Sequence, residues 1–109
     1  MDDKRPELLQ GTLDLLILKT LALEPLHGYG IAQRILASSR EVLQVQQGSL
    51  YPALHRMQRR NLITSEWKES ENGRMAKFYS LTKTGQKQLG EELEQWRRYS
   101  QAVAWVLQS

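Results

Sequence analysis

The stretch Gly48-Ser49-Leu50-Tyr51-Pro52-Ala53-Leu54-His55-Arg56-Met57 decides the fold of this chain, because it predicts an amphipathic helix with a basic outer side. Leu50, Leu54 and Met57 repeat at i, i+4 and i+7, which is the spacing of a buried helix face. We expect Ser49 to cap this helix at its N-terminus. The residues that fall mainly on the other side, which is basic, are Ser49, Pro52, His55, Arg56 and Arg59.

The positive charge of the chain is concentrated on this helix. The 109 residues have a net charge of only +3, yet residues 48–60 hold Arg56, Arg59 and Arg60 and no acid. A local basic patch on a nearly neutral protein indicates an element that binds phosphates. A solvated helix face gives the same cluster, so the order of the elements has to decide between the two. Pro52 is expected in the first turn of the helix, where its missing N–H costs nothing.

Two helices are predicted before the basic one. Residues 8–23 place apolar side chains most of the way round a helix, so this helix has to be buried on more than one side. We expect part of that burial to come from a second subunit, with Leu13 and Leu16 in the interface. Pro25 ends the helix, since the residue before a proline avoids the helical region. A turn at residues 27–30 then leads into the second helix.

The segments around the basic helix are predicted to be extended. Residues 42–45 are expected to form a short strand before it. Residues 62–67 and 77–81 after it are rich in β-branched and aromatic side chains, and the Asn72-Gly73 pair between them is a strong hairpin signal. The sequence therefore predicts a β-hairpin whose polar tip carries Arg74.

The last segment is predicted to be one long helix from Thr82 to about Leu107. Its apolar residues follow the 4-3-7-4 spacing of a coiled-coil seam, in the order Leu89, Leu93, Trp96, Val103 and Leu107. We interpret this seam as a dimer interface, because no other predicted element is long enough to cover it. The alternative is a helix folded back on its own core.

Helix, helix, helix and hairpin is the order of a winged helix-turn-helix, in which the third helix enters the DNA major groove. The fold class is thus mainly α with a small β-hairpin and a long C-terminal dimerisation helix. We expect a DNA-binding domain at 1–81 and a dimerisation helix at 82–109. The hairpin becomes the wing, where Arg74 and Lys77 reach the DNA backbone or the minor groove.

Four segments of the chain also resemble PadR-type transcriptional regulators. They are GTLDLLIL at 11–18, PLHGYGI at 25–31, GSLYPALHRM at 48–57 and RMAKFYSLTKTG at 74–85. The resemblance covers about residues 8–107, and the single C-terminal helix is similar to the short branch of the family often annotated from acidobacteria. It implies a homodimeric repressor that dimerises through its terminal helices.

The resemblance also implies which residues contact DNA, because the SLYP segment begins the recognition helix of such proteins. Ser49 and the amides at a helix N-terminus suit a phosphate, and Arg56 suits a bidentate contact to guanine. For Tyr51 the alternative is packing against the hairpin, and for His55 it is an ordinary exposed histidine. The full set of candidate DNA contacts is Ser49, Tyr51, Pro52, His55, Arg56, Arg59, Arg74 and Lys77.

Trp96 is a candidate ligand contact. Some PadR-like regulators that respond to flat, apolar compounds have an aromatic residue on the terminal helix facing across the dimer, so by resemblance Trp96 could stack a small planar hydrophobic effector. The alternative is plain interface packing, a common role of tryptophan.

Other classes of function find little support in the sequence. The chain has no cysteine, which excludes disulfide scaffolds, thiolate metal sites and cysteine nucleophiles. None of the common hydrolase or P-loop motifs occurs, so we expect no catalytic residues, no cofactor, no metal and no enzyme activity. No apolar run reaches the length of a membrane span, and a cytoplasmic location is expected. The remaining alternative is a winged-helix module that makes protein–protein contacts without specific DNA binding.

Overall fold

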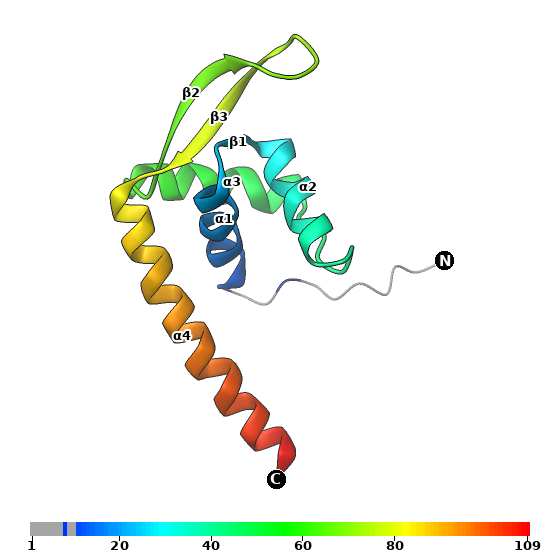
Figure 1. The fold of residues 1–109 in the computed structure, drawn as a ribbon, viewed down its shortest axis with the longest axis vertical. Helices are drawn as coiled ribbons and strands as arrows, with labels where there is room; N and C mark the ends of the chain where they lie inside the picture. Colours follow the sequence, from blue (N-terminus) through cyan, green and yellow to red (C-terminus); the bar gives the residue numbers. More distant parts are fainter. Residues whose placement is uncertain (1–7, 9–10) are drawn as a thin grey trace.

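A three-stranded antiparallel sheet and four helices make up the chain in a computed structural model, which describes residue 8 and residues 11–109. The elements in chain order are α1 (Thr12–Leu23), β1 (Leu26–His27), α2 (Gly28–Ser38), α3 (Gln47–Arg59), β2 (Ile63–Glu69), β3 (Met75–Leu81) and α4 (Lys83–Gln108). Figure 1 shows the hairpin of β2 and β3 projecting from one end of the helical body and α4 projecting from the other. Residues 1–7, 9 and 10, which include part of the predicted first helix, lie outside the described residues.

Helix α1 lies at the centre of the core. It packs against α2, α3, α4 and β3, and Ile17 and Leu18 are fully buried on it, as Ile31 is on α2 and Met57 on α3. The burial that its apolar pattern demands, and that we expected in part from a second subunit, therefore comes largely from the same chain. Leu13 and Leu16 are only partly buried and pack against this core.

The boundaries of α1 differ from the prediction at one end only. The helix begins at Thr12, since its N-cap Gly11 adopts the left-handed conformation with a φ of 90°. At the other end, Glu24 before the proline is extended, as expected.

The third strand of the sheet is not where the sequence predicted it. Residues 42–45 form no strand: Arg40 and Glu41 have positive φ, and Val45 instead packs into the core. The sheet is completed by β1, which pairs antiparallel with β3 so that Leu26 faces Tyr79 and the sheet order is β1-β3-β2. Residues 27–30 are thus not a turn, since α2 begins at Gly28 directly after β1.

Helix α3 begins three residues earlier than predicted, at Gln47, with Gln46 as its N-cap in place of Ser49. Ser49 is therefore inside the first turn and caps nothing, and Pro52 lies in the second turn. Its ring removes the N–H that would bond the carbonyl of Gly48, which is exposed to solvent. The predicted inner face is confirmed, because Leu50, Leu54 and Met57 are buried.

The hairpin is confirmed and its strands are longer than predicted. Ser70 and Arg74 close the tip through a backbone bond of 2.7 Å, and Gly73 takes the left-handed conformation with a φ of 82°. This matches a three-residue loop in which a tight turn is followed by a left-handed glycine.

Helix α4 is confirmed from its predicted cap to its predicted end. The Thr82 hydroxyl accepts a bond from the Gly85 N–H at 2.9 Å and donates to the Asn61 carbonyl at 2.7 Å, which ties the helix to the start of the hairpin. The seam is covered in part within the chain, contrary to our expectation, because α1 packs on the first half of α4. Leu89 is buried there and Leu93 packs against the core.

Candidate nucleic-acid interface

The outward side of α3 is the candidate recognition surface. Its buried residues are Leu50, Ala53, Leu54 and Met57, and at about 100° per residue the opposite side is centred on four exposed residues. We call these the outer row: Gly48, Pro52, His55 and Arg59. Space around Gly48 is open to beyond 4 Å. The row therefore offers a smooth N-terminal half, where a duplex can approach the backbone, and a basic C-terminal half.

Arg56 lies on one flank of the outer row and is held there by an ion pair. Its Nη2 donates to Oδ1 of Asp14 on α1 at 2.8 Å. The arginine side chain is 47% exposed and the aspartate 22%, so the pair sits at the edge of the recognition surface. A guanidinium has five N–H donors, and this one bond leaves others for DNA. Ser49 shares this flank and is exposed.

Tyr51 lies on the other flank, against α2. Its ring packs so closely over Gly28 that a Cβ at this position would overlap the phenol. Half of the side chain remains exposed. Burial raises the pKa of the neighbouring Tyr79 on β3, and Tyr51 raises it further. Tyr51 thus packs on α2, whereas our alternative expected it to pack against the hairpin, and it keeps an exposed edge.

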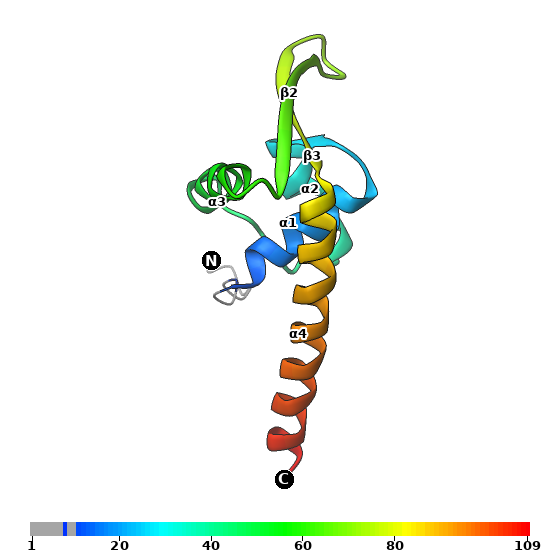
Figure 2. The same cartoon turned by 90° about the vertical axis from the view of Figure 1, so that its left-hand side faces the viewer.

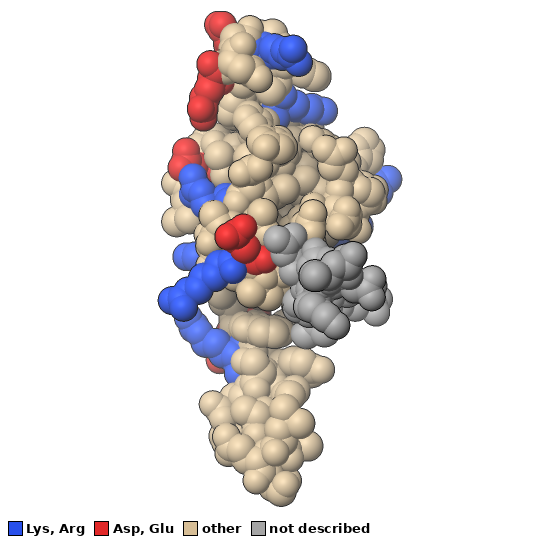
Figure 3. Space-filling model, turned by 90° about the vertical axis from the view of Figure 1, so that its right-hand side faces the viewer, with Lys and Arg blue, Asp and Glu red and all other residues tan. Residues whose placement is uncertain are grey.

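The hairpin lies beside α3 and carries its own basic residues. Arg74 is exposed at the tip, and Lys77 on β3 pairs with Trp67 on β2. The connection from α3 is short, so the hairpin rises directly next to the C-terminal end of α3 (Figure 2). Figure 3 views the face opposite to that of Figure 2, and at the hairpin end it shows basic side chains on one side of the molecule and acidic ones on the other.

The remaining predicted positions fall into two groups. Trp96, Val103 and Leu107 are exposed along α4, whereas Leu89 is buried and Leu93, Leu13 and Leu16 pack against the core of the same chain. The exposed three lie on the second half of α4, where Trp96 also lines a hollow against the start of α1.

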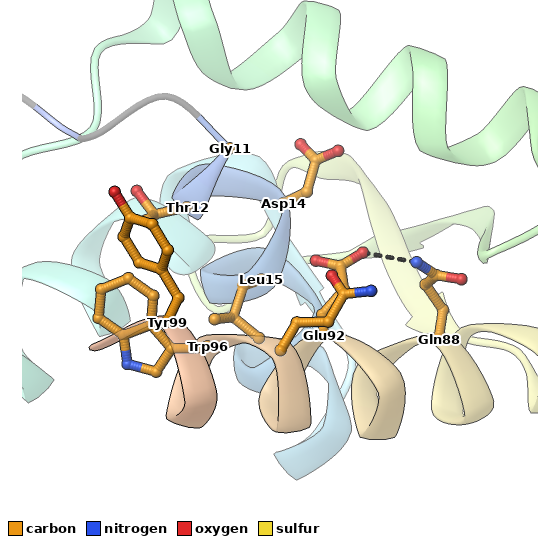
Figure 4. Close-up of a pocket in the computed structure, with 9 residues that line it drawn as sticks. Gly11, Thr12, Asp14, Leu15, Gln88, Glu92, Trp96 and Tyr99 are labelled. Carbon is orange, nitrogen blue, oxygen red and sulfur yellow. Dashed lines mark hydrogen bonds between the residues drawn. The ribbon is translucent and has the colours of Figure 1, made fainter. Parts of the chain in front are cut away.

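A hollow of about 670 Å³ separates the start of α1 from the middle of α4. Figure 4 shows Trp96 and Tyr99 at one end of it and Asp14 and Glu92 at the other. The two aromatic rings lie 6.4 Å apart, and Glu92 accepts a bond from Gln88 at 2.8 Å. The hollow therefore combines an aromatic wall with two carboxylates.

Two further features bear on function. Among residue 8 and residues 11–109, no cluster of three potential ligands could hold a metal ion. No helix in that part of the chain is long and apolar enough to cross a membrane.

Sequence reasoning missed three residues of this surface. Asp14 was read as part of an apolar helix, and only its distance from Arg56 reveals its role. Gly28 was predicted only as part of a turn at residues 27–30, although its small size is what admits Tyr51. Trp67 was read as a strand former, and its exposure could not be known before the extent of the helical body was seen.

Comparisons with known proteins agree with this geometry. The model of the transcriptional regulator PadR-like family matches residues 17–91. A PadR-like regulator from Bacillus cereus is 34% identical with a TM-score of 0.79, covering 93% of this chain and 96% of its own. A PadR-like transcription factor from Bacteroides fragilis is 35% identical with a TM-score of 0.71, covering 88% and 90%. A PadR family regulator from Clostridium difficile is 31% identical with a TM-score of 0.76, covering 89% and 99%.

Proposed function

Because the chain belongs to the PadR-like family of transcriptional regulators, we propose that this DNA-binding regulator is a homodimeric repressor of a near-palindromic operator. The outer row of α3 carries the proposal: it is exposed, ends in Arg59 and stands beside a hairpin that carries Arg74 and Lys77. In a winged helix-turn-helix this arrangement lets α3 enter the major groove while the hairpin reaches the adjoining backbone.

The candidate DNA contacts differ in the part of the duplex that their chemistry suits. Ser49, Tyr51 and Pro52 lie where the first turns of α3 approach the phosphates, and His55 and Arg59 face the groove. Arg56 contacts a guanine from the flank, which gives about 1–3 kcal/mol of discrimination against other bases. Arg74 and Lys77 bind the backbone from the hairpin.

The division of the chain follows from this assignment. Residues 1–81 carry the DNA contacts and residues 82–109 the dimer contacts, with Leu13, Leu16, Leu89 and Leu93 supporting the base of the interface. A two-fold dimer places the two copies of α3 in half-sites about 10–10.5 base pairs apart, or a multiple of that spacing. Repression then results from occlusion of the promoter.

The first experiment is binding to duplex DNA across a range of salt. The probe is a duplex selected by the protein from a random pool, compared with a shuffled duplex of equal length. We expect a preference of about 10³ or more and a steep negative slope of affinity against salt. Equal, weak binding to both duplexes would exclude a sequence-specific regulator.

Two variants assign the contacts. Arg56→Ala should weaken binding to the selected duplex more than to the shuffled one, since it removes a base contact. Arg74→Ala should weaken binding to both duplexes alike. It should also reduce the slope of log affinity against log salt concentration by about one, because it removes a phosphate contact. Equal losses with Arg56→Ala would leave that residue a phosphate contact only.

Trp96 provides a candidate route for regulation. It forms the aromatic wall of the hollow beside α4, so a planar hydrophobic effector could stack on it. In a protein with Trp67→Phe and Trp105→Phe, Trp96 fluorescence should change on titration with planar aromatic compounds. Fluorescence that none of them perturbs would leave Trp96 as interface packing.

A further inference from the structure

The distal part of the hairpin exposes two large apolar side chains. Trp67 on β2 is 64% exposed and Met75 on β3 is 62% exposed. Trp67 pairs directly with Lys77, and Met75 stands two residues farther along the same strand. Because side chains alternate between the faces of a sheet, all three lie on one face, together with Glu69, which pairs with Met75. We call this surface the wing patch: Trp67, Met75 and Lys77.

The wing patch continues the face of the hairpin that packs on the core. Ile63 and Tyr79 have the same alternation along their strands and are 1% and 6% exposed. Tyr79 is also close enough to Tyr51 of α3 for the two phenols to interact. The opposite face holds Phe78, whose ring lies 4.9 Å from the ammonium of Lys68. The patch therefore lies on the face of the hairpin that meets α3 at its base.

Folding of the chain does not account for this patch. The described helices end below the distal half of the hairpin, which rises free of them in both ribbon views (Figures 1 and 2). A tryptophan that is mostly exposed to water does not contribute the free energy of burial that its large apolar ring provides in a core. At the same end of the molecule, Figure 3 shows basic side chains on one side and acidic ones on the other. The ring of Trp67 and the ammonium of Lys77 lie on the face that meets α3, and this pair suits a polyanion with apolar sugar edges, whereas Glu69 lies at the tip end of the same face.

We propose that the wing patch is a second DNA-contact surface, in which Trp67 and Met75 lie against sugar edges of the minor groove and Lys77 binds a phosphate. The minor groove next to the major groove occupied by α3 is the one within reach of the hairpin. Apolar side chains are used in this way by proteins that bind the minor groove. This inference rests on the proposed function, and it adds an apolar contact to a wing that otherwise acts through charge alone.

Tryptophan fluorescence tests the proposal directly, because the chain supplies a matched control. Trp105, near the end of α4, is also 64% exposed and lies far from the hairpin (Figure 1). One protein carries Trp96→Phe and Trp105→Phe and reports on Trp67. The other carries Trp67→Phe and Trp96→Phe and reports on Trp105. Acrylamide quenching of each is measured with and without the selected duplex.

We expect the duplex to reduce the quenching constant of Trp67 by about threefold or more and to leave that of Trp105 nearly unchanged, since a wing contact excludes water at one site only. Protection of Trp67 that rises with protein concentration in the absence of DNA would overturn the proposal in favour of contact with a second copy. Unchanged quenching of Trp67 in a sample that binds DNA by anisotropy would also overturn it. Failure to bind any duplex in that anisotropy measurement would instead overturn the proposed function and this inference together.

Substitution gives a second readout. Trp67→Ala should weaken binding to the selected duplex about fivefold to tenfold, and Trp67→Phe should recover most of the loss because it keeps an aromatic face. The salt slope should stay unchanged in both, since neither removes a charge. Thermal unfolding of the free variants checks that the fold is intact. Equal affinity of Trp67→Ala and wild type would refute the contact.

Discussion

Arg56 can discriminate a base only if its guanidinium is held in one direction, and Asp14 provides that restraint. The bond between them is short, at 2.8 Å, and links two elements that are 42 residues apart in sequence. A charge-assisted bond of this kind is about twice as strong as a neutral one. Asp14 is thus placed to position the base contact that we propose for Arg56, although its negative charge opposes DNA binding in general.

Asp14→Asn should therefore separate specificity from affinity. The variant loses one negative charge, so binding to shuffled duplex should strengthen, while the preference for the selected duplex should fall about threefold to tenfold. In an Arg56→Ala background the same change should leave the preference unaltered, because the two residues act as one unit. Fluorescence anisotropy on both duplexes measures these values.

Glu24→Gln is the matched control for this change. Glu24 forms an ion pair of similar length with Arg34, at 2.7 Å, and its loss alters the net charge by the same amount. We expect it to strengthen binding to both duplexes alike. If Asp14→Asn and Glu24→Gln change the preference for the selected duplex by the same factor, the positioning role of Asp14 is disproved.

Ionisation of Tyr79 lowers the free energy of unfolding at alkaline pH. Burial raises its pKa above the ordinary value of 10.0, and the nearby Tyr51 raises it further. The unfolded chain then releases this proton at a lower pH than the folded chain does. The stabilisation is fully present below pH 10 and is lost as pH rises through the folded pKa.

Tyr79→Phe should remove this dependence. Urea midpoints of the two proteins, measured from pH 8 to pH 11.5, should differ by a constant amount at first, and above pH 10 wild type should fall faster than the variant. Other groups titrate in both proteins, so their effect cancels when one urea midpoint is subtracted from the other. Parallel curves over the whole range would contradict the assignment to Tyr79.

At the scale of elements, a helix or hairpin could be predicted from the sequence where the pattern that signals it lies within one segment of the chain. The spacing of Leu50, Leu54 and Met57 gave the buried face of α3, and the Asn-Gly pair gave the hairpin. The two-residue strand β1 could not be predicted, because its existence depends on pairing with β3, about fifty residues away. The start of α3 was misplaced since Gln46 caps it through its backbone, with no side-chain bond to signal it.

The junction of hairpin and α4 is the most tightly packed of these connections, and glycine is essential there. A Cβ on Gly85 would overlap the backbone oxygen of Leu62, which cannot move without shifting the start of β2. We expect Gly85→Ala to lower the free energy of unfolding by about 2–4 kcal/mol. Gly90→Ala in the same helix meets no atom within 4 Å and should raise it by about 0.5–1 kcal/mol. Urea unfolding followed by circular dichroism gives both values, and a loss in Gly90→Ala would contradict the packing argument.

At the scale of the whole molecule, α4 has two halves with different surroundings. The first half packs on α1, whereas the second projects from the body (Figure 1) and exposes Trp96, Val103 and Leu107. No Lys, Arg, Asp or Glu follows Arg98, and the lower end of the molecule is accordingly uncharged (Figure 3). An uncharged helix with an apolar stripe is unfavourable in water by itself. The spacing of the apolar residues predicted the stripe. Which part of the stripe is buried within the same chain depends on the position of α1, which the spacing does not contain.

A charge placed in this stripe should therefore separate the proposed dimer. Val103→Glu puts a carboxylate at the centre of the exposed stripe, and Gln101→Glu puts the same charge about 160° away round the helix, outside it. In sedimentation, we expect Val103→Glu to be monomeric at concentrations where wild type and Gln101→Glu are dimeric. Because a monomer binds one half-site only, its affinity for the selected duplex should fall about 100-fold. Two variants that dimerise and bind alike would place the dimer contact away from this half of α4.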